Sequence, residues 1–195
     1  MQPHTYIFIG RSGAGKGTQI QLLIEKLKAT TSHQVLHIET GKSFREFIES
    51  NSYSAGLSKE IAGQGGLQPS FLSIWTWSDI LINDFTGKEH LLFDGMPRRM
   101  SEAKILETAL KFYNVENPTV IFLDVSEQWA IDRLFGRGRA DDGKESIAQR
   151  MKWYDKDVAD TVEYMKHNTY YRFLNINGEQ TIEEVHTDIA KALHL

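Results

Sequence analysis

A glycine-rich segment near the start of the chain restricts the possible folds more than any other feature. Residues 10–18, GRSGAGKGT, follow the apolar run at 6–9 and open the amphipathic run at 16–28. A glycine-rich turn between a strand and a helix lets successive main-chain N–H groups point at one anion in front of the helix. Lys16 adds a positive charge that can reach phosphate oxygens. The segment therefore predicts a phosphate-binding loop (P-loop).

Apolar runs and helical patterns alternate along the rest of the chain. We expect strands at residues 6–9, 34–38, 91–93, 120–123 and 171–176, and helices near 16–28, 43–50, 69–85, 101–113, 126–135, 144–167 and 181–193. Strands separated by helices form a parallel sheet that is covered on both faces. The pattern predicts an α/β fold of the P-loop NTPase type, with a five-stranded parallel sheet in a single domain over residues 1–195. Ligands of such sheets bind at the carboxyl ends of the strands.

Composition argues against several classes of function. Acidic residues outnumber basic ones by 26 to 22, which is unlike a nucleic-acid binder. The chain has no cysteine, so we expect neither disulfides nor a zinc site built on thiolates. No apolar run approaches the roughly 20 residues of a membrane span, and the N-terminus does not read as a signal peptide. We therefore expect a cytoplasmic protein without zinc and without nucleic-acid or membrane partners.

Two stretches lack the periodicity of a core element. Residues 50–68 are rich in Ser and Gly, and residues 136–144, GRGRADDGK, consist almost entirely of glycine and charged residues. Solvated surface loops commonly have such compositions. Segments that bury little also open at little cost, so both stretches suit covers that close over a ligand and exclude water.

Four ordered motifs carry a resemblance to a known family. The P-loop ends in Gly-Lys-Gly-Thr, Thr40-Gly41 precedes Arg45, and Asp94-Gly95-Met96-Pro97-Arg98 follows the third expected strand. The fourth motif comprises Arg133, Arg137, Arg139, Asp141, Asp142 and Arg150. Together the motifs resemble those of adenylate kinases and related nucleoside monophosphate kinases. The resemblance covers nearly the whole chain.

The resemblance implies a kinase that uses Mg²⁺ and transfers a phosphoryl group reversibly from ATP to a nucleoside monophosphate (NMP), as a monomer. It implies an NMP-binding segment at residues 40–69 and a very short lid at 134–143. The residues expected to bind ATP are Gly13, Ala14, Gly15, Lys16, Gly17, Thr18, Arg133 and Arg137. Those expected to bind the NMP are Thr40, Gly41, Arg45, Gln68, Gly95, Arg98, Glu102, Arg139 and Arg150. Catalytic roles are implied for Lys16, Arg98, Arg137, Arg139 and Arg150, and Asp94 would hold Mg²⁺ through water.

Elementary chemistry leads to the same kind of site. Phosphoryl transfer spreads negative charge over several oxygens, so catalysis consists mainly of positioning and electrostatic stabilisation. Arginines suit that task because they stay charged and bind phosphate in a bidentate manner. One departure affects the metal: Gly17 stands where a P-loop usually has its Ser or Thr magnesium ligand, and Thr18 comes one position later. Magnesium should then rely on phosphate oxygens, water and carboxylates.

Two residues, Thr40 and Glu102, give conflicting indications of the acceptor base. Thr40 resembles the residue that contacts adenine in AMP-selective members, so AMP is the favoured acceptor. Glu102 stands where adenylate kinases have a glutamine; an ionised carboxylate only accepts hydrogen bonds, which suits the adjacent N–H groups of guanine better. Alternatively, Glu102 is an acidic residue in the first turn of a helix, where the helix dipole favours it.

Other functions remain open at this stage. The chain could phosphorylate GMP, CMP or UMP, or it could be a nucleotide-dependent switch or assembly factor on the same fold. A switch needs neither Arg45 nor Arg98, so their presence favours the enzyme. The seven histidines show no ligand spacing, and the sequence assigns none of them a role.

Overall fold

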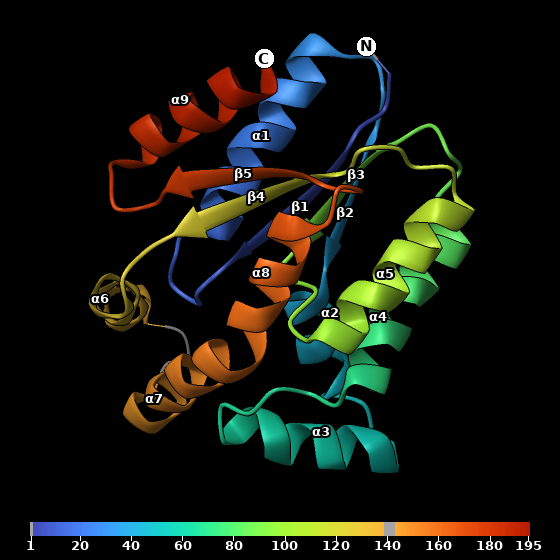
Figure 1. The fold of residues 1–195 in the computed structure, drawn as a ribbon. Helices are drawn as coiled ribbons and strands as arrows, with labels where there is room; N and C mark the ends of the chain where they lie inside the picture. The colour runs from blue at the N-terminus through green and yellow to red at the C-terminus, as the bar shows by residue number, and fades with distance from the viewer. Residues whose placement is uncertain (1, 139–142) are drawn as a thin grey trace.

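Five parallel strands form one sheet, and helices connect them (Figure 1). The computed structural model describes residues 2–138 and 143–195. The strands are β1 (Thr5–Gly10), β2 (Val35–Glu39), β3 (His90–Asp94), β4 (Thr119–Asp124) and β5 (Arg172–Asn177). The helices are α1 (Lys16–Thr30), α2 (Thr40–Phe47), α3 (Tyr53–Gly63), α4 (Ser70–Asp84), α5 (Met100–Phe112), α6 (Glu127–Arg137), α7 (Lys144–Trp153), α8 (Ala159–His167) and α9 (Ile182–Leu193). A π-helical turn, Tyr154–Val158, joins α7 to α8. The predicted α/β class and five-stranded parallel sheet are confirmed.

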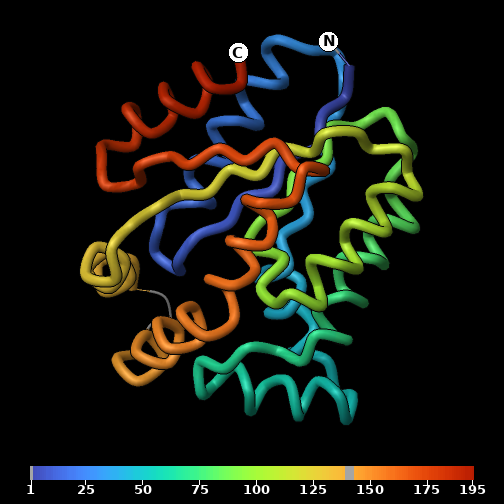
Figure 2. The backbone as a smooth tube through the Cα atoms, viewed as in Figure 1, coloured from blue at the N-terminus to red at the C-terminus, as the bar shows by residue number. Residues whose placement is uncertain are grey.

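The strand order, β2-β3-β1-β4-β5, brings the sequence motifs together. Because all strands run in the same direction, their carboxyl ends meet at one edge of the sheet. The P-loop follows β1 at the centre, α2 follows β2, and Asp94 ends β3. In the strand register Asp94 pairs with Phe8 of β1 on one side and with Glu39 of β2 on the other. The first and last described residues both lie at the top of the view in Figure 2.

Alternate side chains of the strands enter two apolar cores, one on each face of the sheet. Phe8 packs with α1 and α9, whereas Ile7 and Ile9 pack with α4, α5 and α8 on the opposite face. Figure 1 shows these two helix layers above and below the strands. All three side chains are at most 3% exposed, which explains why β1 reads as a continuous apolar run rather than an alternating one. No helix within the described residues is long and apolar enough to cross a membrane.

The expectation of a surface loop at residues 50–68 is wrong for most of that stretch. Helix α3 occupies Tyr53–Gly63, and the Ser52 hydroxyl caps it by accepting a hydrogen bond from the Ala55 N–H at 3.1 Å. The helix buries little besides Ala55 and Ser58, so its sequence lacks the apolar stripe by which a helix is usually recognised.

Two other elements differ from the expected boundaries. Helix α2 begins at Thr40, directly after β2, and not near residue 43. The helix expected at 144–167 has that extent, but the π-helical turn interrupts it. Part of the expected lid, residues 139–142, lies outside the described residues.

Candidate active site

The P-loop surrounds Lys16 with main-chain groups. Gly13 and Gly15 adopt φ values of +91° and +90°, which glycine accepts without strain, and Gly15 is the N-cap of α1. The Lys16 ammonium donates hydrogen bonds to the carbonyl oxygens of Gly10 and Arg11, both at 2.8 Å. Burial lowers the pKa of Lys16 to about 8, although Asp94 opposes the shift. A bound phosphate would supply the negative charge that a buried ammonium group lacks.

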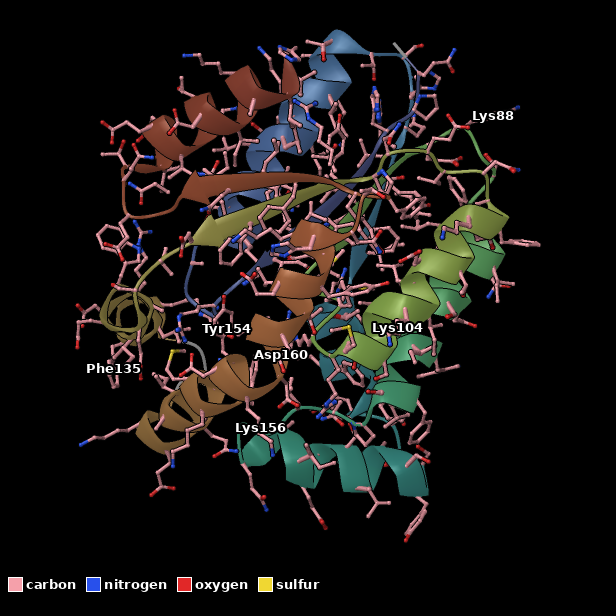
Figure 3. The ribbon with its side chains drawn as sticks, viewed as in Figure 1. Lys88, Lys104, Phe135, Tyr154, Lys156 and Asp160 are labelled. Atoms are coloured by element: carbon pink, nitrogen blue, oxygen red, sulfur yellow. The ribbon has the colours of Figure 1, made fainter. Side chains whose placement is uncertain are left out.

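Arg11 fastens the P-loop to the junction of α7 and α8. Its guanidinium forms an ion pair with Asp155 at 2.8 Å and lies 4.1 Å from the centre of the Tyr154 ring. Tyr154 is labelled in Figure 3, where α7 and α8 meet. Both partners belong to the π-helical turn, a distortion that proteins often place at functional sites. The P-loop is therefore attached at its first residues to the π-helical turn between α7 and α8.

A cavity of about 710 Å³ opens at the carboxyl ends of the strands, in front of the P-loop. The predicted site residues that line it are Gly13, Gly15, Lys16, Gly17, Thr18, Thr40, Gly41, Arg45, Gln68, Asp94, Gly95, Arg98, Glu102, Arg133, Arg137 and Arg150. Two predicted residues do not appear there. Ala14 is 4% exposed and packs in the core, so its side chain is structural. Arg139 lies outside the described residues, as do Asp141 and Asp142.

On the side of β2 and α2, the predicted acceptor groups are already engaged. Arg45 donates to a carboxylate oxygen of Glu39 at 2.9 Å, and roughly half of its side chain remains exposed. The amide of Gln68 donates to the main-chain oxygen of Ser58 and accepts from the Ser58 hydroxyl, at 2.9 and 2.8 Å. A ligand that uses these groups would therefore have to replace these contacts.

Glu102 lies at the start of α5 and also borders the cavity. Its side chain lines the cavity yet is only 2% exposed, and one oxygen accepts a hydrogen bond from the Arg98 N–H at 2.9 Å. The other oxygen lies 3.7 Å from the Arg99 guanidinium. The carboxylate thus stabilises the start of α5 and at the same time borders the cavity.

Besides Arg45 of α2, four more arginines among the described residues line the same cavity. Arg98, after β3, donates to the Gly95 carbonyl at 2.7 Å and lies 5.3 Å from the centre of the Trp153 ring. On α6, the Arg133 guanidinium lies 5.0 Å from the centre of the Trp129 ring. Arg137, in the last turn of α6, and Arg150, in the last turn of α7, complete the set.

His37 and Glu39 are among the polar residues of this cavity that the sequence does not single out. Both belong to β2 and are two residues apart, so they lie on the same face of the strand. The His37 Nε2 atom lies 3.9 Å from a carboxylate oxygen of Asp94. The signal available in the sequence was their position at the carboxyl end of a strand next to Thr40-Gly41.

This arrangement defines a class of enzyme. A P-loop lysine, a carboxylate at the end of the neighbouring strand and several arginines around one cavity are the parts of a P-loop phosphotransferase.

Comparisons with known proteins identify the family within this class of enzyme. The family model "Adenylate kinase" matches residues 8–170. Relatives named adenylate kinase include one from Prochlorococcus marinus (strain AS9601), 33% identical over 187 residues, which cover 96% of this chain and 97% of that protein. Others come from Corynebacterium aurimucosum, 33% identical over 188 residues (96% and 98%), and Bacteroides fragilis, 31% identical over 191 residues (96% of both). The chain belongs to the adenylate kinase family. It is a nucleoside monophosphate kinase, as its motifs predict.

Proposed function

We propose that the protein catalyses the reversible reaction of ATP with AMP to give two molecules of ADP. The observation that carries the proposal is the common cavity of the P-loop, Arg45 and Arg98. The P-loop provides a site for the donor's phosphates, and Arg45 provides a cation for the acceptor's phosphate. Arg98 stands between them, after β3. A nucleotide switch would need only the first of these groups.

The chain's own residues supply charge and position. Lys16 would hold the donor's phosphates through its ammonium group, and Arg98 and Arg150 would stabilise the negative charge that spreads over the transferring oxygens. Arg137, next to the lid, would approach the same phosphates when the lid closes. Closure matters because water is a competing acceptor.

The residues present fit magnesium. Asp94 and Glu39 are register partners at the ends of neighbouring strands, so carboxylate oxygens line the cavity beside the P-loop. Magnesium prefers oxygen ligands and keeps several of its waters. Burial raises the pKa of Asp94, an effect that Lys16 opposes, and a bound cation would favour the ionised carboxylate. When bound, the ion would neutralise phosphate charge, and Asp94 would orient it through water.

AMP is the acceptor that we favour, because Thr40 resembles the residue that contacts adenine in AMP-selective members of the family. In support, Thr40 is buried at the start of α2 and lines the cavity. Glu102 supports the second candidate, GMP, and CMP and UMP complete the set to be tested. The experiment mixes the protein with Mg-ATP and each monophosphate in turn and measures ADP. We expect AMP to have the highest kcat/KM. A higher value for another monophosphate would overturn the assignment of the base, and no ADP with any of them would overturn the proposed reaction.

We also propose that the protein acts as a monomer in the cytoplasm, as the family resemblance implies. Light scattering at micromolar concentration tests the first point, and fractionation of the source cells tests the second.

A further inference from the structure

One imidazole and two carboxylates meet at the edge of the cavity, where β2 and β3 end. One potential ligand atom from each of His37, Glu39 and Asp94 lies within 4.8 Å of the other two. The strands fix this arrangement. Glu39 and Asp94 are register partners, and His37 lies two residues before Glu39 on the same strand.

Within this cluster, the imidazole of His37 gives the main indication of a bound ligand. Its Nε2 atom is buried, and no group among the described residues forms a hydrogen bond with it. Asp94 is the nearest carboxylate, but 3.9 Å is too long for a hydrogen bond. Buried polar atoms normally have partners, so one without a partner calls for an explanation.

The distances suit a shared cation. Ligand atoms about 2.1 Å from one ion lie roughly 3.0 Å apart at a right angle and about 4.2 Å apart on opposite sides. The separation of 3.9 Å between His37 and Asp94 falls inside that window. The widest separation in the group, up to 4.8 Å, needs a closure of about half an ångström. Glu39 can provide it, because about a third of its side chain is exposed.

Within the described part of the chain, three cationic side chains lie near the cluster, Arg45, Lys16 and Arg98, and Arg98 donates to the Gly95 carbonyl at 2.7 Å. Arg45 engages one oxygen of Glu39, and the Lys16 ammonium donates to two main-chain carbonyls of the P-loop. A carboxylate has a second oxygen, so Glu39 can keep the contact with Arg45 while it binds an ion.

We propose that His37, Glu39 and Asp94 bind one divalent transition-metal ion in the absence of nucleotide. One imidazole and two carboxylates favour Mn²⁺, Fe²⁺ or Co²⁺, whereas Mg²⁺ prefers an all-oxygen shell and sheds water reluctantly. Three protein ligands leave coordination positions open, so the site is exchangeable and differs from a closed structural zinc site. Its consequence for catalysis, a preference for Mn²⁺ over Mg²⁺, rests on the proposed function; the binding site itself does not.

The experiment titrates the nucleotide-free protein with Mn²⁺ and follows free and bound ion by electron paramagnetic resonance. We expect one bound Mn²⁺ per chain, with pulsed spectra showing coupling to one directly bound imidazole nitrogen. His37→Asn should abolish that coupling and weaken binding at least about 10-fold. His167→Asn, an exposed histidine on α8, is the matched control and should change neither result. Absence of binding, or binding without nitrogen coupling, would overturn the proposal.

Glu39→Gln keeps the inference testable if His37→Asn does not fold. The Glu39 side chain is partly exposed, so its amide should be accommodated, and Mn²⁺ affinity should fall at least about 10-fold. Unchanged affinity would overturn the proposal. The assay of ADP formation with Mg-ATP is independent of this result. Phosphoryl transfer without Mn²⁺ binding to the free protein would remove only the metal site, whereas Mn²⁺ binding without phosphoryl transfer would remove only the proposed function.

Discussion

His37 and His90 lie in neighbouring strands of one sheet, but their surroundings are opposite in kind. His90, at the start of β3, is completely buried, and both ring nitrogens have partners. Its Nδ1 accepts from the His4 N–H at 3.0 Å, and its Nε2 lies 3.1 Å from the Thr31 hydroxyl. His37, towards the carboxyl end of β2, leaves Nε2 without a partner among the described residues and faces two carboxylates.

The surroundings of His90 are those of a structural group, whereas those of His37 suit the binding of a ligand. Burial lowers the pKa of His90 to about 4, and the neighbouring His33 and His4 add to the shift, so the ring is neutral at physiological pH and contributes to packing. At the carboxyl ends of the strands the polar groups point into a cavity, and several have partners that a ligand would replace. We therefore expect substitutions at the carboxyl ends to change activity and substitutions at the amino ends to change stability.

The largest effect is expected at Lys16. Lys16→Ala removes the charge held inside the P-loop and should lower kcat/KM about 100-fold or more, as the loss of a preorganised charge does. The melting temperature should not fall, because the buried ammonium is a cost to folding in the absence of ligand. Lys28→Ala, at the exposed end of α1, is the control. Near-normal turnover of the Lys16 variant would refute the donor site.

Arg45→Ala should mainly affect the acceptor. It removes the charge that we propose binds the monophosphate's phosphate and should raise the KM for that substrate about 10- to 100-fold, with a smaller change in kcat. Lys42→Ala, one turn away and paired with Glu46, should leave the KM unchanged. Steady-state kinetics with varied monophosphate measures both. A fall in kcat at constant KM would place Arg45 at the transferring group instead.

Glu102 belongs to both kinds of group, because it has a structural partner, the Arg98 N–H, and also lines the cavity. Glu102→Gln retains an oxygen that can accept from the Arg98 N–H and adds a donor toward the acceptor base. We expect the AMP-to-GMP ratio of kcat/KM to rise about 5-fold, which corresponds to one hydrogen bond of about 1 kcal/mol. An unchanged ratio would make Glu102 purely a helix-start carboxylate.

The smallest effect on activity is expected at His90. As pH falls from about 6.5, the unfolded chain takes up a proton that folded His90 does not bind until about pH 4, so stability declines across that interval. His90→Asn should have a lower melting temperature at pH 7, a weaker decline toward pH 4, and unchanged kcat/KM. His167→Asn should retain the decline. A large loss of activity in the folded His90 variant would contradict the expectation that substitutions at the amino ends of the strands affect only stability.

The sequence predicts the fold and most of the cavity lining because these depend on local patterns. Apolar runs, glycines and the Asp-Gly-Met-Pro-Arg segment each indicate an element or a turn without reference to distant residues. The ligand cluster around His37 depends on which strands are neighbours, and the order β2-β3-β1 cannot be read from spacing along the chain. Helix α3 escaped prediction because it buries too little to show a periodic pattern, and the π-helical turn because π and α geometry share similar side-chain patterns.

Position 65 should accept fewer amino acids than its neighbours in the chain, because Gly65 lies close to α7. It follows α3 with φ +68°, and a Cβ at this position would lie 2.7 Å from the Ser146 hydroxyl oxygen and 2.8 Å from the Ser146 Cα of α7. The Trp153 indole, at the end of α7, donates to the Gly65 carbonyl at 3.0 Å. In a library of random variants, positions in the exposed parts of residues 50–68 should accept many amino acids, and position 65 should accept only glycine. Where lineages of such proteins diverge, α3 can drift in composition while its junction with α7 is inherited unchanged, because any side chain at position 65 would push α7 away from the end of α3.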